Sequence, residues 1–180
     1  MNRFPIIARE GQLLLLAAVL AAVVVLHFFG PPASLPLWGL GLLILVAFRD
    51  PEREIPSQPM AIVSPADARV TSVGTTRDPY LDRDSIRVTL QMNPWGVFTT
   101  RSPVEGKILQ PPSMPEDSRI PHGVWLQTDE GDDVVMVMMR GRLHTAPRCY
   151  IRIGERIGQG KRCGFVHLGG QIDVYLPERS

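Results

Sequence analysis

The chain has 180 residues and a mass of 20.0 kDa, with 44% hydrophobic residues, 21% charged residues and a formal net charge of +1. A chain of this length can bury one compact core and leaves little for a second large domain. The near-neutral balance excludes a protein that binds nucleic acid by neutralising phosphates, because such a protein needs an excess of basic groups. Seventeen prolines and 16 glycines favour a β-rich domain with many turns.

Two apolar segments occupy the first part of the chain, over residues 13–29 and 35–48, and a Gly-Pro-Pro break separates them. Arginines flank the pair on both sides and the connector carries no charge. The pattern predicts a two-helix membrane hairpin over residues 1–48, with the following domain on the cytoplasmic side of the cell inner membrane. Two alternatives are a cleaved signal peptide, which explains only the first segment, and a buried helical pair in a soluble protein.

From residue 49 to residue 180 the hydrophobic period is two, which is typical of half-buried strands, and no segment has helical spacing. The apolar run at 134–139 predicts a central strand, joined by a turn to the preceding strand. The proline-rich stretch 111–121 predicts an exposed loop. We therefore expect a mainly β domain of the β-sandwich or barrel-like class. The expected strands cover residues 86–92, 124–128, 134–139, 151–153 and 172–176.

Three motifs follow one another along the chain. Residues 48–56 read FRDPEREIP, residues 62–67 read IVSPAD, and residues 160–177 read GKRCGFVHLGGQIDVYLP. In this order and spacing they resemble the short, membrane-anchored type of phosphatidylserine decarboxylase. Members of that family carry FRDPxRxIP after two apolar helices, then SPADG, DVHxNRxPxxG and GxxFGSRVDVYLP. The resemblance extends from the hairpin to Pro177 and implies that family's fold.

In that family, a serine hydroxyl attacks the preceding carbonyl, and the chain breaks to leave a pyruvoyl group. This ketone forms an imine with phosphatidylserine and accepts electrons as carbon dioxide leaves. The resemblance places the Gly-Ser cleavage pair on Gly169 and Gly170, so the serine position holds a glycine. The acid and the imidazole of the central motif fall on Gly96 and Phe98. Of the family's catalytic groups, the resemblance leaves Asp67.

These departures lead us to expect a catalytically inactive family member, which acts as a binding, regulatory or assembly subunit at the cytoplasmic membrane face. No cofactor is expected, because the family's pyruvoyl group could not form. Two alternatives are an active phosphatidylserine decarboxylase in phosphatidylethanolamine synthesis and a purely structural subunit of a membrane complex. The expected partners are the lipid bilayer, an anionic phospholipid, and another membrane protein or an active paralogue, with no nucleic acid.

A few side chains remain as candidates for other roles. Asp67 and Arg101 are candidate lipid-binding residues, because a guanidinium can bind a phosphate bidentately. The alternative for Asp67 is a turn residue that bonds to its own backbone. Phe98 either fills the core or plugs a former active-site cavity. Cys149 and Cys163 are expected in the core, and the histidines are too widely spaced to predict a metal site.

Overall fold

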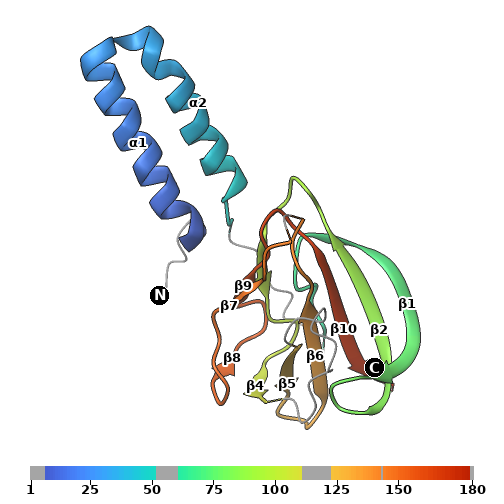
Figure 1. Cartoon of the computed structure of the whole chain (residues 1–180). Helices are drawn as coiled ribbons and strands as arrows, with labels where there is room; N and C mark the ends of the chain where they lie inside the picture. The colour runs from blue at the N-terminus through green and yellow to red at the C-terminus, as the bar shows by residue number, and fades with distance from the viewer. Residues whose placement is uncertain (1–6, 52–60, 111–122, 143, 179–180) are drawn as a thin grey trace. The chain divides into compact units, whose positions relative to one another are not determined.

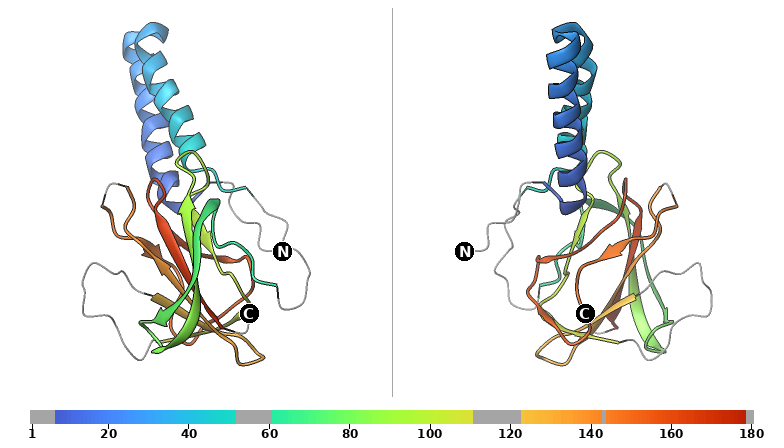
Figure 2. Two further views of the ribbon diagram at one scale, coloured as in Figure 1. Left: turned by 90° about the vertical axis from the view of Figure 1, so that its right-hand side faces the viewer. Right: turned by 60° about the vertical axis from the view of Figure 1, so that its left-hand side comes forward.

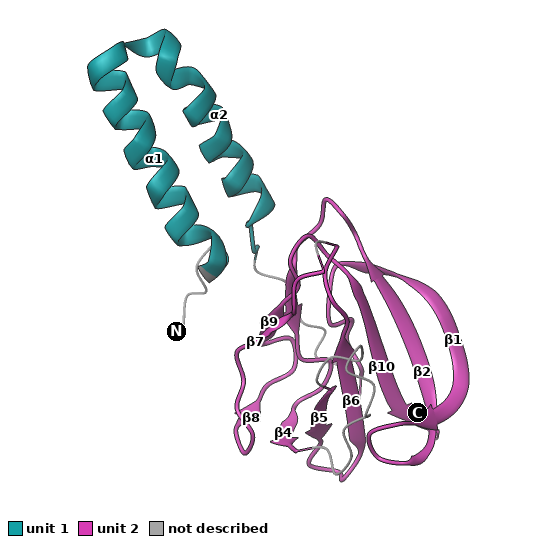
Figure 3. Cartoon of the chain, in the orientation of Figure 1, with its two compact units in different colours: residues 1–53 teal, residues 54–180 magenta. Residues whose placement is uncertain are grey.

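The computed structural model describes residues 7–51, 61–110, 123–142 and 144–178. The chain divides into two compact units, residues 1–53 and 54–180 (Figure 3). The expected division between residues 48 and 49 stays a prediction, and the expected loop at 111–121 lies outside the described residues.

The first unit is a helical hairpin made of α1 (Arg9–Phe29) and α2 (Pro31–Ala47), drawn in blue and cyan in Figure 1. Gly30 joins the two helices with a φ of +81°, a conformation that glycine adopts without strain. At the open end of the hairpin, the Ala8 amide donates a hydrogen bond of 2.8 Å to the Phe48 carbonyl. The expected pair of apolar helices is therefore present.

One helix among the described residues is long and apolar enough to cross a membrane, by length and composition. It covers residues 10–29 with a mean hydropathy of 2.5. Its large side chains are exposed in the isolated chain, for example Leu13 and Phe29 at 74% each. An apolar surface of this kind is typical of a segment that contacts lipid. The second helix, α2, is apolar but has 17 residues, and a second crossing stays a prediction.

The second unit consists of two antiparallel sheets, which Figure 2 shows from two further sides. The mainly β fold expected from the sequence is confirmed. The large sheet has the order β1 (Ala68–Asp78), β2 (Arg83–Met92), β10 (Gln171–Pro177), β6 (Asp133–Met138), β5 (Gly123–Gln127), β4 (Gly106–Leu109) and β8 (Arg156–Ile157). The small sheet has the order β3 (Thr99–Arg101), β9 (Arg162–Phe165) and β7 (Arg148–Cys149).

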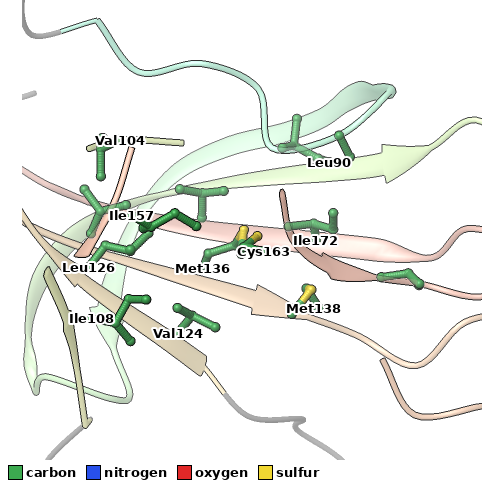
Figure 4. Close-up of a cluster of buried hydrophobic side chains, with 14 of the residues drawn as sticks. Leu90, Val104, Ile108, Val124, Leu126, Met136, Met138, Ile157, Cys163 and Ile172 are labelled. Atoms are coloured by element: carbon green, nitrogen blue, oxygen red, sulfur yellow. The ribbon is translucent and has the colours of Figure 1, made fainter. Parts of the chain in front are cut away.

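The core of this unit is organised around β6, which is buried on both faces. Met136 and Met138 point into the main hydrophobic cluster, whereas Val135 and Val137 belong to a second cluster on the opposite face. A continuous apolar run is the pattern that a strand buried on both faces requires. The main cluster, shown in Figure 4, includes Leu90, Val104, Ile108, Val124, Leu126, Met136, Met138, Ile157, Cys163 and Ile172.

Four of the five expected strands are confirmed, as β2, β5, β6 and β10. The expected strand at 151–153 is wrong, because these residues form the connection between β7 and β8. The Glu155 amide donates to the Arg152 carbonyl, and the Glu155 carboxylate accepts from the Arg152 amide, both over 3.1 Å. These two bonds close a turn that leaves Ile153 65% exposed.

Candidate functional site

Three connecting segments meet at one end of the large sheet. In the strand register, Ala68 at the start of β1 pairs with Met92 at the end of β2. At the same end, Gln171 at the start of β10 pairs with Gln91 of β2. The segments that precede β1, follow β2 and precede β10 therefore converge. These segments carry the motif residues that the sequence singled out.

Gly170, at the position of the family's serine, is held against β2 by two hydrogen bonds. Its carbonyl accepts from the Met92 amide over 2.9 Å and from the Gln91 side chain over 3.3 Å. The residue is buried, and a Cβ placed on it would lie 3.0 Å from Val166 Cγ1 and 3.1 Å from the Arg140 carbonyl oxygen. The backbone here is therefore enclosed and has no side-chain hydroxyl.

Asp67 supplies the carboxylate at this end of the sheet. Its backbone carbonyl accepts from the Asn93 amide over 2.9 Å, and the Gly96 amide donates to the Asn93 carbonyl over 3.1 Å. A Cβ placed on Gly96 would lie 2.6 Å from Asp67 Oδ2. The Asp67 carboxylate thus occupies the space beside residue 96, where the family motif places its own acid. An acidic side chain at position 96 would require Asp67 to move.

Phe98 packs beside the Gly169–Gly170 pair. Its side chain is 5% exposed, and its ring meets the ring of Phe165 edge to face, with 6.4 Å between the centroids. The Phe98 carbonyl accepts from the Val166 amide over 3.0 Å. Phe98 Cε1 lies 3.7 Å from the position that a Cβ on Gly169 would take. The ring therefore fills the space next to this backbone, and its role as a plug stays a prediction.

A cleft of about 450 Å³ opens at the same end of the sheet. Asp67 is the one lining residue that the sequence singled out. Arg69 and Gln91 were missed, although the alternation along β2 places Gln91 on its polar face. Asn93 belongs to the turn that follows β2 and carries no periodic signal. The lining residues are Asp67, Ala68, Arg69, Thr71, Gln91, Met92, Asn93 and Pro94.

Other candidate residues lie away from this cleft. Arg101 is buried and does not line it; its amide donates to the Pro65 carbonyl over 2.7 Å and its guanidinium to the Gly160 carbonyl over 3.2 Å. Burial raises the pKa of the Cys163 thiol to about 12. Cys149 is exposed on β7, so its expected place in the core is wrong. Within the described ranges, no three His, Cys, Asp or Glu side chains gather as metal ligands.

Comparisons with known proteins identify the family. The family model described as phosphatidylserine decarboxylase matches residues 40–180. The chain belongs to the phosphatidylserine decarboxylase family. It is similar to the phosphatidylserine decarboxylase proenzyme of Nitrosomonas eutropha, with 38% identity, and to those of Nitrosomonas europaea and Burkholderia cenocepacia, with 36% identity each. These alignments cover 96% of this chain and 85% or 86% of the relatives. No solved structure matches the chain.

This relationship contradicts two expectations drawn from the sequence. We expected a catalytically inactive subunit and no cofactor, because of the residues at positions 96, 98 and 170. The curated relatives, which match over nearly the whole chain, are named as decarboxylase proenzymes. They favour the alternative, an active enzyme of a family that uses a pyruvoyl group. The residue at position 170 nevertheless does not fit a pyruvoyl group formed there, because glycine has no hydroxyl, and we assign no step through such a group.

Proposed function

We propose that this chain is a phosphatidylserine decarboxylase, which removes the carboxyl group of the lipid's serine headgroup. The observation that carries the proposal is the identity of 36–38% with curated proenzymes over 96% of the chain. The same family match covers the whole β unit, including the end of the sheet at which the cleft opens.

The residues of the cleft support a headgroup that carries both positive and negative groups as the ligand. Phosphatidylserine carries an ammonium, a carboxylate and a phosphate. The carboxylate of Asp67 suits the ammonium, and the guanidinium of Arg69 suits either anionic group. Gln91 and Asn93 add side-chain amides that can donate and accept. We propose Asp67 as the residue that orients the substrate amine.

We further propose that the enzyme works at the inner membrane of a bacterium, with its β unit in the cytoplasm. The arginines on both sides of the apolar hairpin support this orientation. Cys149 offers a test, since its side chain is exposed. A membrane-impermeant maleimide should label it in inverted membrane vesicles and not in intact spheroplasts. Association with another membrane protein or a paralogous decarboxylase is a further proposal, which crosslinking in native membranes would test.

The enzymatic proposal is tested with the full chain, purified in detergent from a host that lacks its own decarboxylase. The substrate is phosphatidylserine labelled in the serine carboxyl carbon, and the readouts are released carbon dioxide and phosphatidylethanolamine. The variant Asp67→Asn should lower the rate by about a hundredfold, because a misplaced substrate amine reacts more slowly by about that factor. Asp84→Asn is the matched control, because Asp84 is an exposed acid at the other end of β2. Absence of product with the unsubstituted chain would reject the proposal.

The intact mass of the same preparation should also be measured by mass spectrometry. A second sample should be treated with hydroxylamine, which reacts with carbonyl groups, because decarboxylation of an amino acid needs an electron sink. An active chain that keeps its intact mass of 20.0 kDa has not been cleaved into two polypeptides. Loss of activity on treatment with hydroxylamine would show that a carbonyl takes part. The mass of any fragments would identify the residue at which the chain breaks.

A further inference from the structure

Two exposed apolar side chains flank the end of the sheet at which the cleft opens. Trp95, in the turn after β2, is 86% exposed, and Leu168, before β10, is 41% exposed. The two turns lie close together: a Cβ on Gly169 would be 3.6 Å from the Asn93 carbonyl oxygen. A tryptophan and a leucine exposed on neighbouring turns are favourable at a membrane interface.

Leu168 is held in an unusual backbone conformation. Its φ is +55°, in the left-handed region, and Gly169 follows with a φ of +73°. The Gly169 amide closes the turn by donating to the Val166 carbonyl over 3.1 Å. A left-handed conformation is strained for leucine, so the turn presents this side chain outward at a cost in stability. Strain of this kind points to a role for the presented side chain.

The same end of the unit is basic. Arg140 and Arg142 follow β6, and both are exposed. The Arg142 amide donates to the Gly169 carbonyl over 3.1 Å, which ties this segment to the turn that carries Leu168. Segments 93–98, 139–147 and 166–170 contain no Asp or Glu. Asp67, whose carboxylate lies beside Gly96, lines the cleft.

We propose that this surface, made of Trp95, Leu168, Arg140 and Arg142, docks onto an anionic lipid bilayer. The two apolar side chains enter the interfacial region, and the two arginines contact lipid phosphates. A bilayer is the occupant that fits, because the surface combines an exposed tryptophan, an exposed leucine and two exposed arginines. The same chain also carries an apolar helix of membrane-spanning length. Docking would bring lipid headgroups to the mouth of the cleft. The proposal adds to the decarboxylase proposal and does not depend on it.

The test uses tryptophan fluorescence of the full chain reconstituted in vesicles. All variants carry Trp38→Phe, which removes the emission of the tryptophan in α2. The emission of Trp95 is the difference between the variant Trp38→Phe and the variant Trp38→Phe/Trp95→Phe. The vesicles contain phosphatidylcholine with brominated acyl chains, with or without phosphatidylglycerol. In the anionic vesicles, bromine should reduce the Trp95 emission to about half or less, as for an interfacial tryptophan. In the neutral vesicles the loss should be small.

Two variants separate docking from general proximity to the membrane. Arg140→Gln/Arg142→Gln should abolish the excess quenching in anionic vesicles, and Ile153→Gln, at an exposed apolar residue away from the cleft, should leave it unchanged. Unquenched Trp95, or quenching that is independent of phosphatidylglycerol, would overturn the proposal. The vesicles contain no phosphatidylserine and the readout needs no turnover. An inactive chain would therefore not affect the test of docking. An active enzyme with unquenched Trp95 would reject the docking proposal and leave the decarboxylase proposal standing.

Discussion

The buried backbone at Gly170 provides a quantitative test of how tightly this end of the sheet is packed. In the variant Gly170→Ala, the new methyl group would lie 3.0 Å from Val166 Cγ1 and 3.1 Å from the Arg140 carbonyl oxygen. Val166 is fully buried, so both neighbours must shift. Overpacking of this kind lowers the free energy of unfolding by about 1–3 kcal/mol. Replacing glycine by alanine also restricts the unfolded chain, which raises the free energy of unfolding by about 0.4–1 kcal/mol. The expected net destabilisation is about 1–2 kcal/mol.

The assay is thermal unfolding of the full chain in detergent, monitored by circular dichroism in the β region. For a unit of this size, the expected loss is a fall in Tm of about 3–8 °C. The matched control is Gly74→Ala in β1, where an added Cβ meets no atom within 4 Å. Equal melting temperatures for the two variants would refute the reasoning about crowding. They would show that a side chain at position 170 is accommodated freely.

Two further predictions concern titratable groups. At pH 8, a thiol reagent should modify Cys149 in the native chain, because this residue is exposed. The reagent should reach Cys163 only after denaturation, because Cys163 is buried and burial raises the pKa of its thiol to about 12. Rapid modification of both cysteines in the native chain would contradict the buried position of Cys163 in β9. Burial also raises the pKa of Asp78 above 3.8, so the folded state keeps this proton to higher pH than the unfolded state, and stability falls as the pH rises through the raised value. The Tm of the variant Asp78→Asn relative to the unsubstituted chain should therefore increase as the pH rises above the ordinary pKa of an aspartate. A shift in the opposite direction would show that the pairing with Arg83 outweighs burial.

Hydrophobic patterning was sufficient to predict much of the fold. The two apolar segments became α1 and α2, and the apolar run at 134–139 became the central strand β6. The long edge strand β1 shows the limit of this reasoning. Most of its residues are exposed, so it has no alternating pattern, and its pairing with β2 is fixed by backbone hydrogen bonds. At 151–153 the alternation of apolar and polar residues was present, but a turn formed by Arg152 and Glu155 prevents pairing.

The motifs singled out residues that lie close together in the structure, but did not describe how they would lie. Asp67, Gly96, Phe98 and Gly170 belong to three separate motifs and meet at one end of the large sheet. The position of the Asp67 carboxylate over Gly96 depends on the turn from Asn93 to Gly96, which no periodic signal describes. The exposure of Trp95 likewise depends on that turn. The inactivity expected from the absent motif groups is contradicted by the relatives that match over 96% of the chain, which are named as proenzymes.

The proposed decarboxylase activity is measured by incubating the purified full chain with carboxyl-labelled phosphatidylserine and quantifying both products. We expect equal molar amounts of labelled carbon dioxide and of unlabelled phosphatidylethanolamine, with the rate lost in Asp67→Asn and retained in Asp84→Asn. Intact lipid after prolonged incubation, with a chain that is folded by circular dichroism, would contradict the proposed activity.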